Sequence, residues 1–217
     1  GSAGSKDVTV VAATSAKTIA GQINNVSGDT NVTASARTDV KLSFSAAGSY
    51  SLTLKSDNST AETITFSLGS ASGDELSSAI TAFNDKSSKT GVTAALSADK
   101  SGIVLSNATG NDIALADTAV ANAGTTTLQA VGADGSTAVG SSRVLAADTT
   151  ADTSIVVGQI TFDSAKTFSV AQAAAGTNLL GAAGAVATGS TLNKVSDLDV
   201  STVTKSNEAI KTIDSAL

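Results

Sequence analysis

Short runs of alternating apolar and polar residues, each closed by a polar turn, constrain this chain most. The clearest run is "SYSLTLKSDNSTAETITFSLG", which begins at Ser49. Tyr50, Leu52 and Leu54 alternate with polar residues, "SDNST" supplies a turn, and the alternation returns as far as Leu68. A period of two places one face of a strand on a core and the other in solvent. The stretch therefore predicts a β-hairpin.

The same alternation recurs along the chain and predicts further strands. Val40, Leu42 and Phe44 show it most clearly among the remaining stretches. Turns rich in Asp, Asn and Gly separate the segments, which favours antiparallel neighbours. Further strands are predicted within 7–13, 30–45, 92–115, 126–147 and 153–172.

One internal repeat combines a short helix with a strand. "KTIAGQINNVSGDTNVTASART" (17–38) parallels "DELSSAITAFNDKSSKTGVTAALSAD" (74–99). Each copy has helical spacing of apolar residues, a polar loop containing Asn, and then "NVTAS" or "GVTAA" opening a strand. Ser72 and Glu75 have the spacing of a capping box before the second helix. Helices are too few for βαβ winding, so the predicted class is α+β, mainly antiparallel β, with two small domains that each pack a short helix on strands.

The C-terminal stretch "DVSTVTKSNEAIKTIDSAL" has the pattern of an amphipathic helix. Val203, Ile210, Ile213 and Leu217 fall on one stripe, and a hydroxyl at Ser201 or Thr202 suits an N-cap. We expect the start of a longer helix here. At the other end, "GSAGS" (1–5) is predicted to be a cloning remnant, although natural Gly/Ser linkers look the same.

The composition excludes several classes of function. The 217 residues include no His and no Cys, so Ser-His-Asp and Cys-His triads cannot form within the chain. The net charge is −6 without a basic cluster, which argues against nucleic acid and membrane surfaces as partners. We predict no catalytic residues, no metal and no cofactor. An enzyme would have to work with carboxylates, Lys or Ser alone.

Three motifs have both a functional and a structural interpretation. Asp74 and Glu75 could bind calcium, but acidic residues also favour a helix N-terminus. "DNST" at 57 and "DGST" at 134 lack the spacing of a calcium loop and are predicted to be turns. "GTNLLGAAGAVATG" (176–189) lacks the G-K-[ST] ending of a nucleotide loop and is predicted to be an irregular loop.

The repeat and the tail together resemble bacterial flagellin. "AITAFNDKSSKTGVTAALSADKSGIVLSNATGNDI" (79–113) is similar to the flagellin insertion motif, and "GQITFDSAKTFSV" (158–170) to the β segment that closes flagellin outer domains. "LDVSTVTKSNEAIKTIDSAL" (198–217) resembles the entry to the C-terminal core helix. The pattern is closest to Pseudomonas-type flagellins. One departure is Asn31, which stands where the motif has Gly.

The resemblance implies the variable, surface-exposed outer domains of a flagellin, the structural subunit of an extracellular filament that serves motility and antigenicity. Residues 6–40 and 151–196 would form an inner domain, 41–150 an inserted outer domain, and 199–217 the start of a core helix. Linkers would then lie near 38–41 and 148–152.

The partners implied are other flagellin subunits, contacted through core helices, and host antibodies, with the isolated chain a monomer. O-glycosylation would fall on exposed hydroxyls at Ser59, Thr60, Thr125, Thr126 and Ser136, although β propensity and solubility also explain these residues. The alternatives are a flagellar cap or hook-associated protein and a bacterial surface adhesin.

Overall fold

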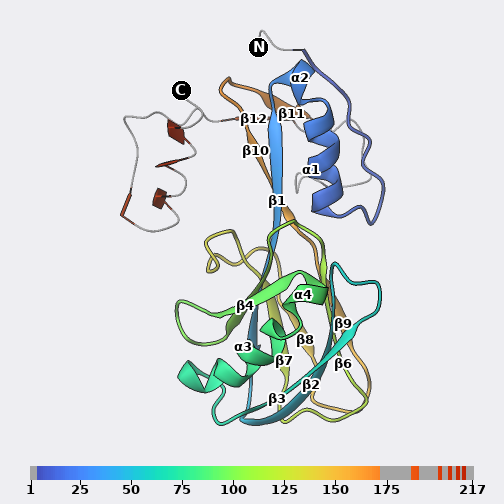
Figure 1. The fold of residues 1–217 in the computed structure, drawn as a ribbon, viewed down its shortest axis with the longest axis vertical. Helices are drawn as coiled ribbons and strands as arrows, with labels where there is room; N and C mark the ends of the chain where they lie inside the picture. The colour runs from blue at the N-terminus through green and yellow to red at the C-terminus, as the bar shows by residue number, and fades with distance from the viewer. Residues whose placement is uncertain are drawn as a thin grey trace. The chain divides into compact units, whose positions relative to one another are not determined.

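The computed structural model describes residues 4–171 and 187–190, and near the C-terminus residues 200, 201, 205, 206, 209, 210, 212 and 213. Antiparallel strands dominate it and are joined by a few short helices, which confirms the α+β class (Figure 1). The chain divides into two compact units. Unit 1 comprises Gly1–Thr14, Thr18–Ala34 and Thr161–Leu217, and unit 2 comprises Ser15–Lys17 and Ser35–Ile160.

Unit 2 is built on two sheets that share one core. The larger has the strand order β4-β5-β1-β7-β8, with β10 also paired to β1, and the smaller has the order β3-β2-β6-β9. The strands of the larger sheet are β1 (Thr33–Phe44), β4 (Val92–Leu96), β5 (Ile103–Asn107), β7 (Thr126–Ala130), β8 (Arg143–Leu145) and β10 (Gln159–Asp163). Those of the smaller sheet are β2 (Gly48–Lys55), β3 (Glu62–Leu68), β6 (Ile113–Asp117) and β9 (Thr153–Val156).

The predicted hairpin is the centre of the smaller sheet. β2 and β3 pair in antiparallel register, with Tyr50 opposite Phe66 and Leu52 opposite Ile64. These side chains are buried, while the residues between them face outward. The apolar residues of the alternating pattern are therefore buried and the polar residues between them face outward, because successive strand residues point to opposite faces.

An aromatic cluster fills the core of unit 2. Phe44, Tyr50 and Phe66 have ring centroids 4.9 to 5.5 Å apart, and Phe83 lies 6.0 Å from Phe66. Such pairs add stability beyond their buried area. The Tyr50 hydroxyl donates to the Ala46 carbonyl at 2.7 Å, so the one polar atom of the cluster is satisfied.

A helix covers the gap between the two sheets. The 3-10 turn η1 (Gly73–Leu76) leads into α3 (Ser77–Asn84), which packs against β3 of the smaller sheet and β4 of the larger one. Leu76, Ala79 and Phe83 of this segment are fully buried. At the other end of the sheets β8 contacts β9. Each of the four edge strands, β3, β4, β8 and β9, thus lies beside another element of unit 2.

Unit 1 contains the first helix–strand copy and a small two-stranded sheet. Its helices are α1 (Ala16–Asn25) and α2 (Ser27–Thr30), and its sheet pairs β11 (Ser169–Ala171) with β12 (Ala187–Gly189). Ile19, Ala20 and Ile23 are the buried face of α1, at the spacing of an amphipathic helix.

Several sequence predictions need correction. Residues 7–11 form no strand. The linker predicted at 38–41 lies inside β1, where Thr38 and Val40 are fully buried, and the chain passes between units within β1 and β10 instead. Ser72 makes no side-chain capping bond, because the segment opens as a 3-10 turn.

Part of the C-terminal prediction can be tested in the structure. The described residues at 205–206, 209–210 and 212–213 are helical, as the pattern predicts. Ala209 is buried, whereas Ile210 and Ile213 of the apolar stripe are exposed. Val203, Leu217 and most of the Gly-rich stretch 176–189 lie outside the described residues.

Candidate functional site

The two copies of the repeat share one hydrogen-bonded architecture, offset by sixty positions. In the second copy α3, the short helix α4 (Ser87–Thr90) and β4 follow one another. The Asn84 amide donates to the Ala94 carbonyl at 2.9 Å, and the Ala94 amide donates to the Asn84 side-chain oxygen at 2.8 Å. In the first copy Asn24 and Ala34 make the same two bonds, at 2.8 and 2.7 Å. One Asn in each copy thus binds the last turn of a helix to a strand. We call this pair of bonds the Asn clip.

A threonine fixes the bend between helix and strand in both copies. The Thr90 hydroxyl donates to the Lys86 carbonyl at 3.0 Å and accepts from the Val92 amide at 3.2 Å. Thr30 makes the matching bonds to Val26 and Val32, at 3.0 and 3.3 Å. These bonds satisfy backbone groups that the end of a short helix leaves without partners.

The residue after this threonine has a left-handed backbone in both copies, with φ +67° at Gly91 and +54° at Asn31. A side chain at Gly91 would collide with Asp57, because its Cβ would overlap the Asp57 Oδ2. Asp57 is held in place by Asn107 and Asn111, whose amides donate to its Oδ1 at 2.8 and 2.7 Å. Asn31 can adopt the left-handed conformation because the short polar side chain of Asn can hydrogen-bond locally. The departure from the motif at Asn31 therefore preserves the backbone shape.

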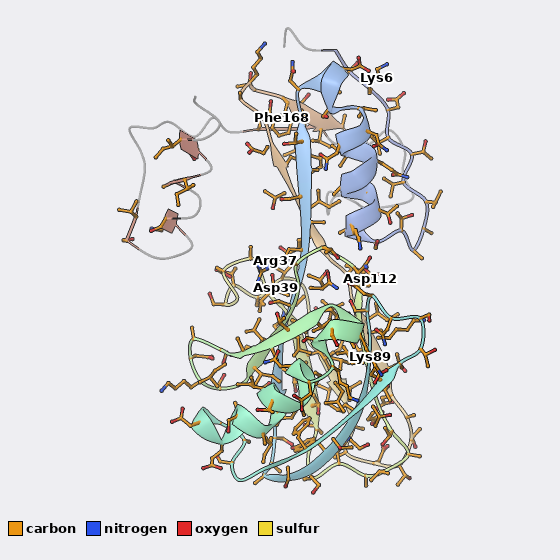
Figure 2. The ribbon with its side chains drawn as sticks, viewed as in Figure 1. Lys6, Arg37, Asp39, Lys89, Asp112 and Phe168 are labelled. Atoms are coloured by element: carbon orange, nitrogen blue, oxygen red, sulfur yellow. The ribbon has the colours of Figure 1, made fainter. Side chains whose placement is uncertain are left out.

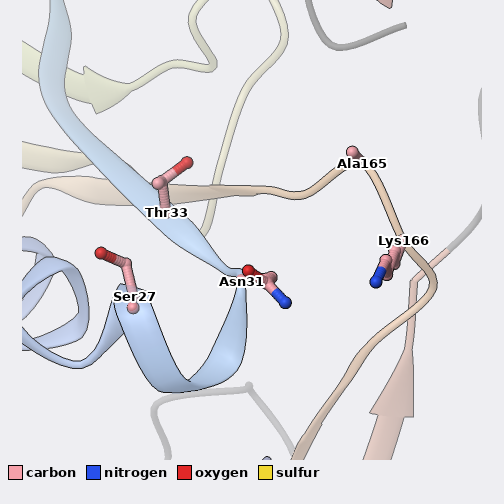
Figure 3. Close-up of a pocket in the computed structure, with 6 residues that line it drawn as sticks. Ser27, Asn31, Thr33, Ala165 and Lys166 are labelled. Atoms are coloured by element: carbon pink, nitrogen blue, oxygen red, sulfur yellow. The ribbon is translucent and has the colours of Figure 1, made fainter. Parts of the chain in front are cut away.

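The first copy borders a shallow pocket of about 400 Å³ (Figure 3). Its lining consists of Ser27, Gly28, Asn31, Thr33, Ala165 and Lys166. The Ser27 hydroxyl donates to the Asn24 carbonyl at 2.7 Å, and not to a basic side chain that could activate it as a nucleophile. The lining holds neither a carboxylate nor an imidazole, so this pocket has no general acid–base pair.

Burial raises the pKa of two carboxyl groups of unit 2, those of Asp117 and Asp112. Asp117 is 2% exposed; its Oδ1 accepts from the Asp152 amide, and its Oδ2 is buried without a hydrogen-bond partner. Burial raises the pKa of Asp117, and the nearby Asp152 and Asp148 raise it further. Burial also raises the pKa of Asp112, against the Gly158 amide. Among the described residues, no group of three or more acidic side chains is arranged to hold a metal ion.

The acidic residues Asp74, Glu75 and Asp134 lie in a helical turn and a loop turn, as the structural interpretation of the sequence predicts. Asp74 and Glu75 lie exposed in the first turn of η1. Asp134 closes its own turn, accepting from the Ser136 and Thr137 amides at 2.9 Å. The hydrogen bond from the Thr137 hydroxyl, followed by these two amide bonds, lowers the pKa of Asp134 to about 2.

The five predicted modification positions differ in exposure. Ser59, Thr60 and Ser136 are exposed in loops, and Thr125 is half-buried. Thr126 was wrongly predicted to be exposed: it begins β7, points into the core and is 1% exposed. Its hydroxyl is not accessible to a modifying enzyme. Modification at the other four positions stays a prediction.

Comparison with known protein sequences finds similarity to flagellin. Residues 1–48 match the family model of the Flagellin hook IN motif. A B-type flagellin of Pseudomonas aeruginosa is 33% identical over 136 residues, which is 62% of this chain. The resemblance to bacterial flagellin of the Pseudomonas type is confirmed. The chain spans about a quarter of that flagellin, 27% of its length.

The family match falls on the first copy of the repeat, whereas the sequence motif was assigned to the second, 79–113. Both copies contain the Asn clip. Sequence reasoning found the repeat but missed the clip. The sequence did contain a signal for the clip, because in each copy an Asn precedes an Ala by ten residues.

No helix in the described part of the chain has the length and hydropathy of a membrane span.

Proposed function

We propose that this chain is the outer, surface-exposed part of a bacterial flagellin, the structural subunit of the flagellar filament. The observation that carries the proposal is the similarity to a B-type flagellin, joined to a flagellin motif in unit 1. The proposed role is structural: the chain would form folded domains on the surface of an extracellular filament that serves motility and presents antigenic surface. No catalytic step is part of it.

The chain order supports an inner and an outer domain. Unit 1 contains both the first and the last residues of the chain, and unit 2 is inserted between its segments. We assign unit 1 to the inner domain and unit 2 to the inserted outer domain. The helical residues near the C-terminus would then lead toward the filament core, whose helices contact other subunits.

Unit 2 suits an exposed position. Helix α3 packs against β3 and β4, and β8 contacts β9, so each edge strand of its two sheets lies beside another element. The net charge of −6 favours solubility. The isolated chain is accordingly expected to be a monomer in dilute solution.

Immunogold electron microscopy with serum raised against this chain tests the proposal on the native bacterium. Label along the whole filament is expected. Label confined to the filament tip or the hook junction would instead assign the chain to a cap or hook-associated protein. Label on the cell body would favour a surface adhesin and refute the flagellin assignment.

A further inference from the structure

A reactive dipeptide lies at the tip of the connection between β7 and β8. Asp134–Gly135 is the one Asp–Gly pair in the sequence, which contains no Asn–Gly pair. Asp134 is exposed, so water reaches its carboxyl group. Glycine has no Cβ to shield its backbone nitrogen from the preceding side chain. An Asp followed by Gly is therefore the aspartate most open to attack by the next backbone nitrogen.

This attack is the first step of aspartate isomerisation. The Gly135 nitrogen bonds to the Asp134 Cγ, and the bond from Cγ to the carboxyl hydroxyl breaks. The hydroxyl leaves as water with the amide proton, which closes a succinimide ring. Water then opens the ring: breaking the new Cγ–N bond restores aspartate, whereas breaking the original peptide bond to Gly135 gives isoaspartate. The mass of the chain is unchanged, and no oxidant or reductant takes part.

The turn restrains both reacting groups. The Asp134 Oδ1 accepts from the Ser136 and Thr137 amides at 2.9 Å, and its Oδ2 accepts from the Thr137 hydroxyl. The Gly135 amide donates to the Gly132 carbonyl at 2.8 Å. The carboxyl must give up its bonds to turn toward the Gly135 nitrogen, and that nitrogen must lose its bonded proton. The folded turn therefore opposes the attack at both atoms.

The same hydrogen bonds keep the carboxyl group ionised. They lower the pKa of Asp134 from 3.8 to about 2, and the Thr137 hydroxyl makes the largest contribution. Only the protonated carboxyl carries a hydroxyl that can leave. At a pH above both pKa values, returning the pKa of Asp134 to 3.8 raises the protonated fraction about 60-fold.

We propose that Asp134–Gly135 is a site of spontaneous isomerisation to isoaspartate, kept closed by the hydrogen bonds of its own turn. In the folded chain the carboxyl is ionised and the nitrogen keeps its proton, so the reaction is slow. Where the turn opens, both restraints end together and the reaction proceeds. This chemistry is separate from the proposed role in a filament and does not depend on it.

Isomerisation would damage more than the turn, because isoaspartate routes the main chain through Cβ and Cγ and adds one atom to the backbone. The Gly132 amide closes the turn by donating to the Thr137 carbonyl at 2.8 Å. Next to it, Val131 is 1% exposed, and its amide donates to the carbonyl of Asp39, which lies on β1 beside Arg37 (Figure 2). An extra backbone atom at the tip would misalign these bonds and weaken the attachment of the β7–β8 connection to β1.

The test measures isoaspartate at Asp134 in the whole chain, kept at about pH 5, above both pKa values of this carboxyl. After digestion, the isoaspartyl peptide has the same mass as the parent peptide but a different retention time in liquid chromatography with mass spectrometry. Wild type unfolded in guanidinium chloride gives the rate of the open site. We expect folded wild type to isomerise at least about tenfold more slowly than the unfolded chain.

Four variants separate the turn from the rest of the chain. Thr137→Val removes the hydroxyl bond and leaves the two amide bonds, so the folded variant should isomerise about tenfold faster than folded wild type. Thr137→Ser keeps a hydroxyl and should stay slow. Thr93→Val, at an exposed Thr of β4, is the matched control and should behave as wild type. Asp134→Glu should give no isomerised product at this position, because its longer side chain does not form a succinimide.

Three results would overturn the proposal: equal rates in folded and unfolded wild type, no isoaspartate at Asp134 in the unfolded chain, or equal rates in folded Thr137→Val and Thr93→Val. Fluorescence of the buried Tyr50 shows whether each variant is folded. The comparison of folded with unfolded wild type needs no variant, so it is decisive even if Thr137→Val does not fold. No filament is needed, so failure here is separate from failure of the flagellin assignment.

Discussion

The Asn clip of the second copy allows a quantitative prediction. Asn84→Ala removes both hydrogen bonds between the Asn84 side chain and Ala94. Ala94 is 8% exposed, and its backbone N–H and C=O then lose these partners. A hydrogen bond contributes about 0.5–1.5 kcal/mol net, and a buried group left unpaired costs more. Because Asn84 itself is half-buried, water replaces part of the loss. We expect a loss of about 2–3 kcal/mol in the free energy of unfolding of unit 2.

The single tyrosine makes the assay specific. Tyr50 lies in the core of unit 2 and is 2% exposed, so its fluorescence during urea unfolding reports on that unit. Asn84→Asp keeps the shape and the acceptor but cannot donate to the Ala94 carbonyl, so it should also be destabilising. Ser88→Ala, at an exposed position of α4, is the matched control and should change stability by no more than about 0.5 kcal/mol. If Asn84→Ala unfolds at the same urea concentration as Ser88→Ala, the clip is not a stabilising element.

Three further predictions concern unit 2 and its copy in unit 1. Gly91→Asn should cost about 2 kcal/mol because its side chain meets Asp57, whereas Asn31→Gly should stay within about 1 kcal/mol; equal losses in urea unfolding would contradict this account. Phe83→Ala should cost about 3–5 kcal/mol, measured through Tyr50, and a loss near that of Ser88→Ala would show that α3 does not close the core. Burial raises the pKa of Asp117 above its unfolded value, so ionising it costs stability as the pH rises through the folded-state pKa. Asp117→Asn should therefore unfold at higher urea than wild type at neutral pH and converge with it below about pH 4; a difference independent of pH would refute the reasoning.

Local patterns predicted much of the secondary structure. The hairpin around Tyr50 and Phe66 follows from alternation, and α1 follows from the spacing of Ile19 and Ile23. The predictions were wrong where the local sequence was compatible with more than one structure. The run at 7–13 has strand composition, but residues 7–11 have no strand partner in the structure. Thr126 falls in a predicted strand, but the weak alternation there did not show that its side chain points into the core.

By itself, the sequence determined the α+β class, the two-copy repeat, the resemblance to flagellin and the absence of His- and Cys-based chemistry. The resemblance rests on motifs, and the other three depend on composition and on periods of two and 3.6 residues, which are local. Only the tertiary structure decided that Asp57 fills the space beside Gly91 and that Asn84 bonds to β4. Each brings together residues from different elements, and strand order, which places β2 beside β6 and β1 beside β5, is set by packing of the whole core.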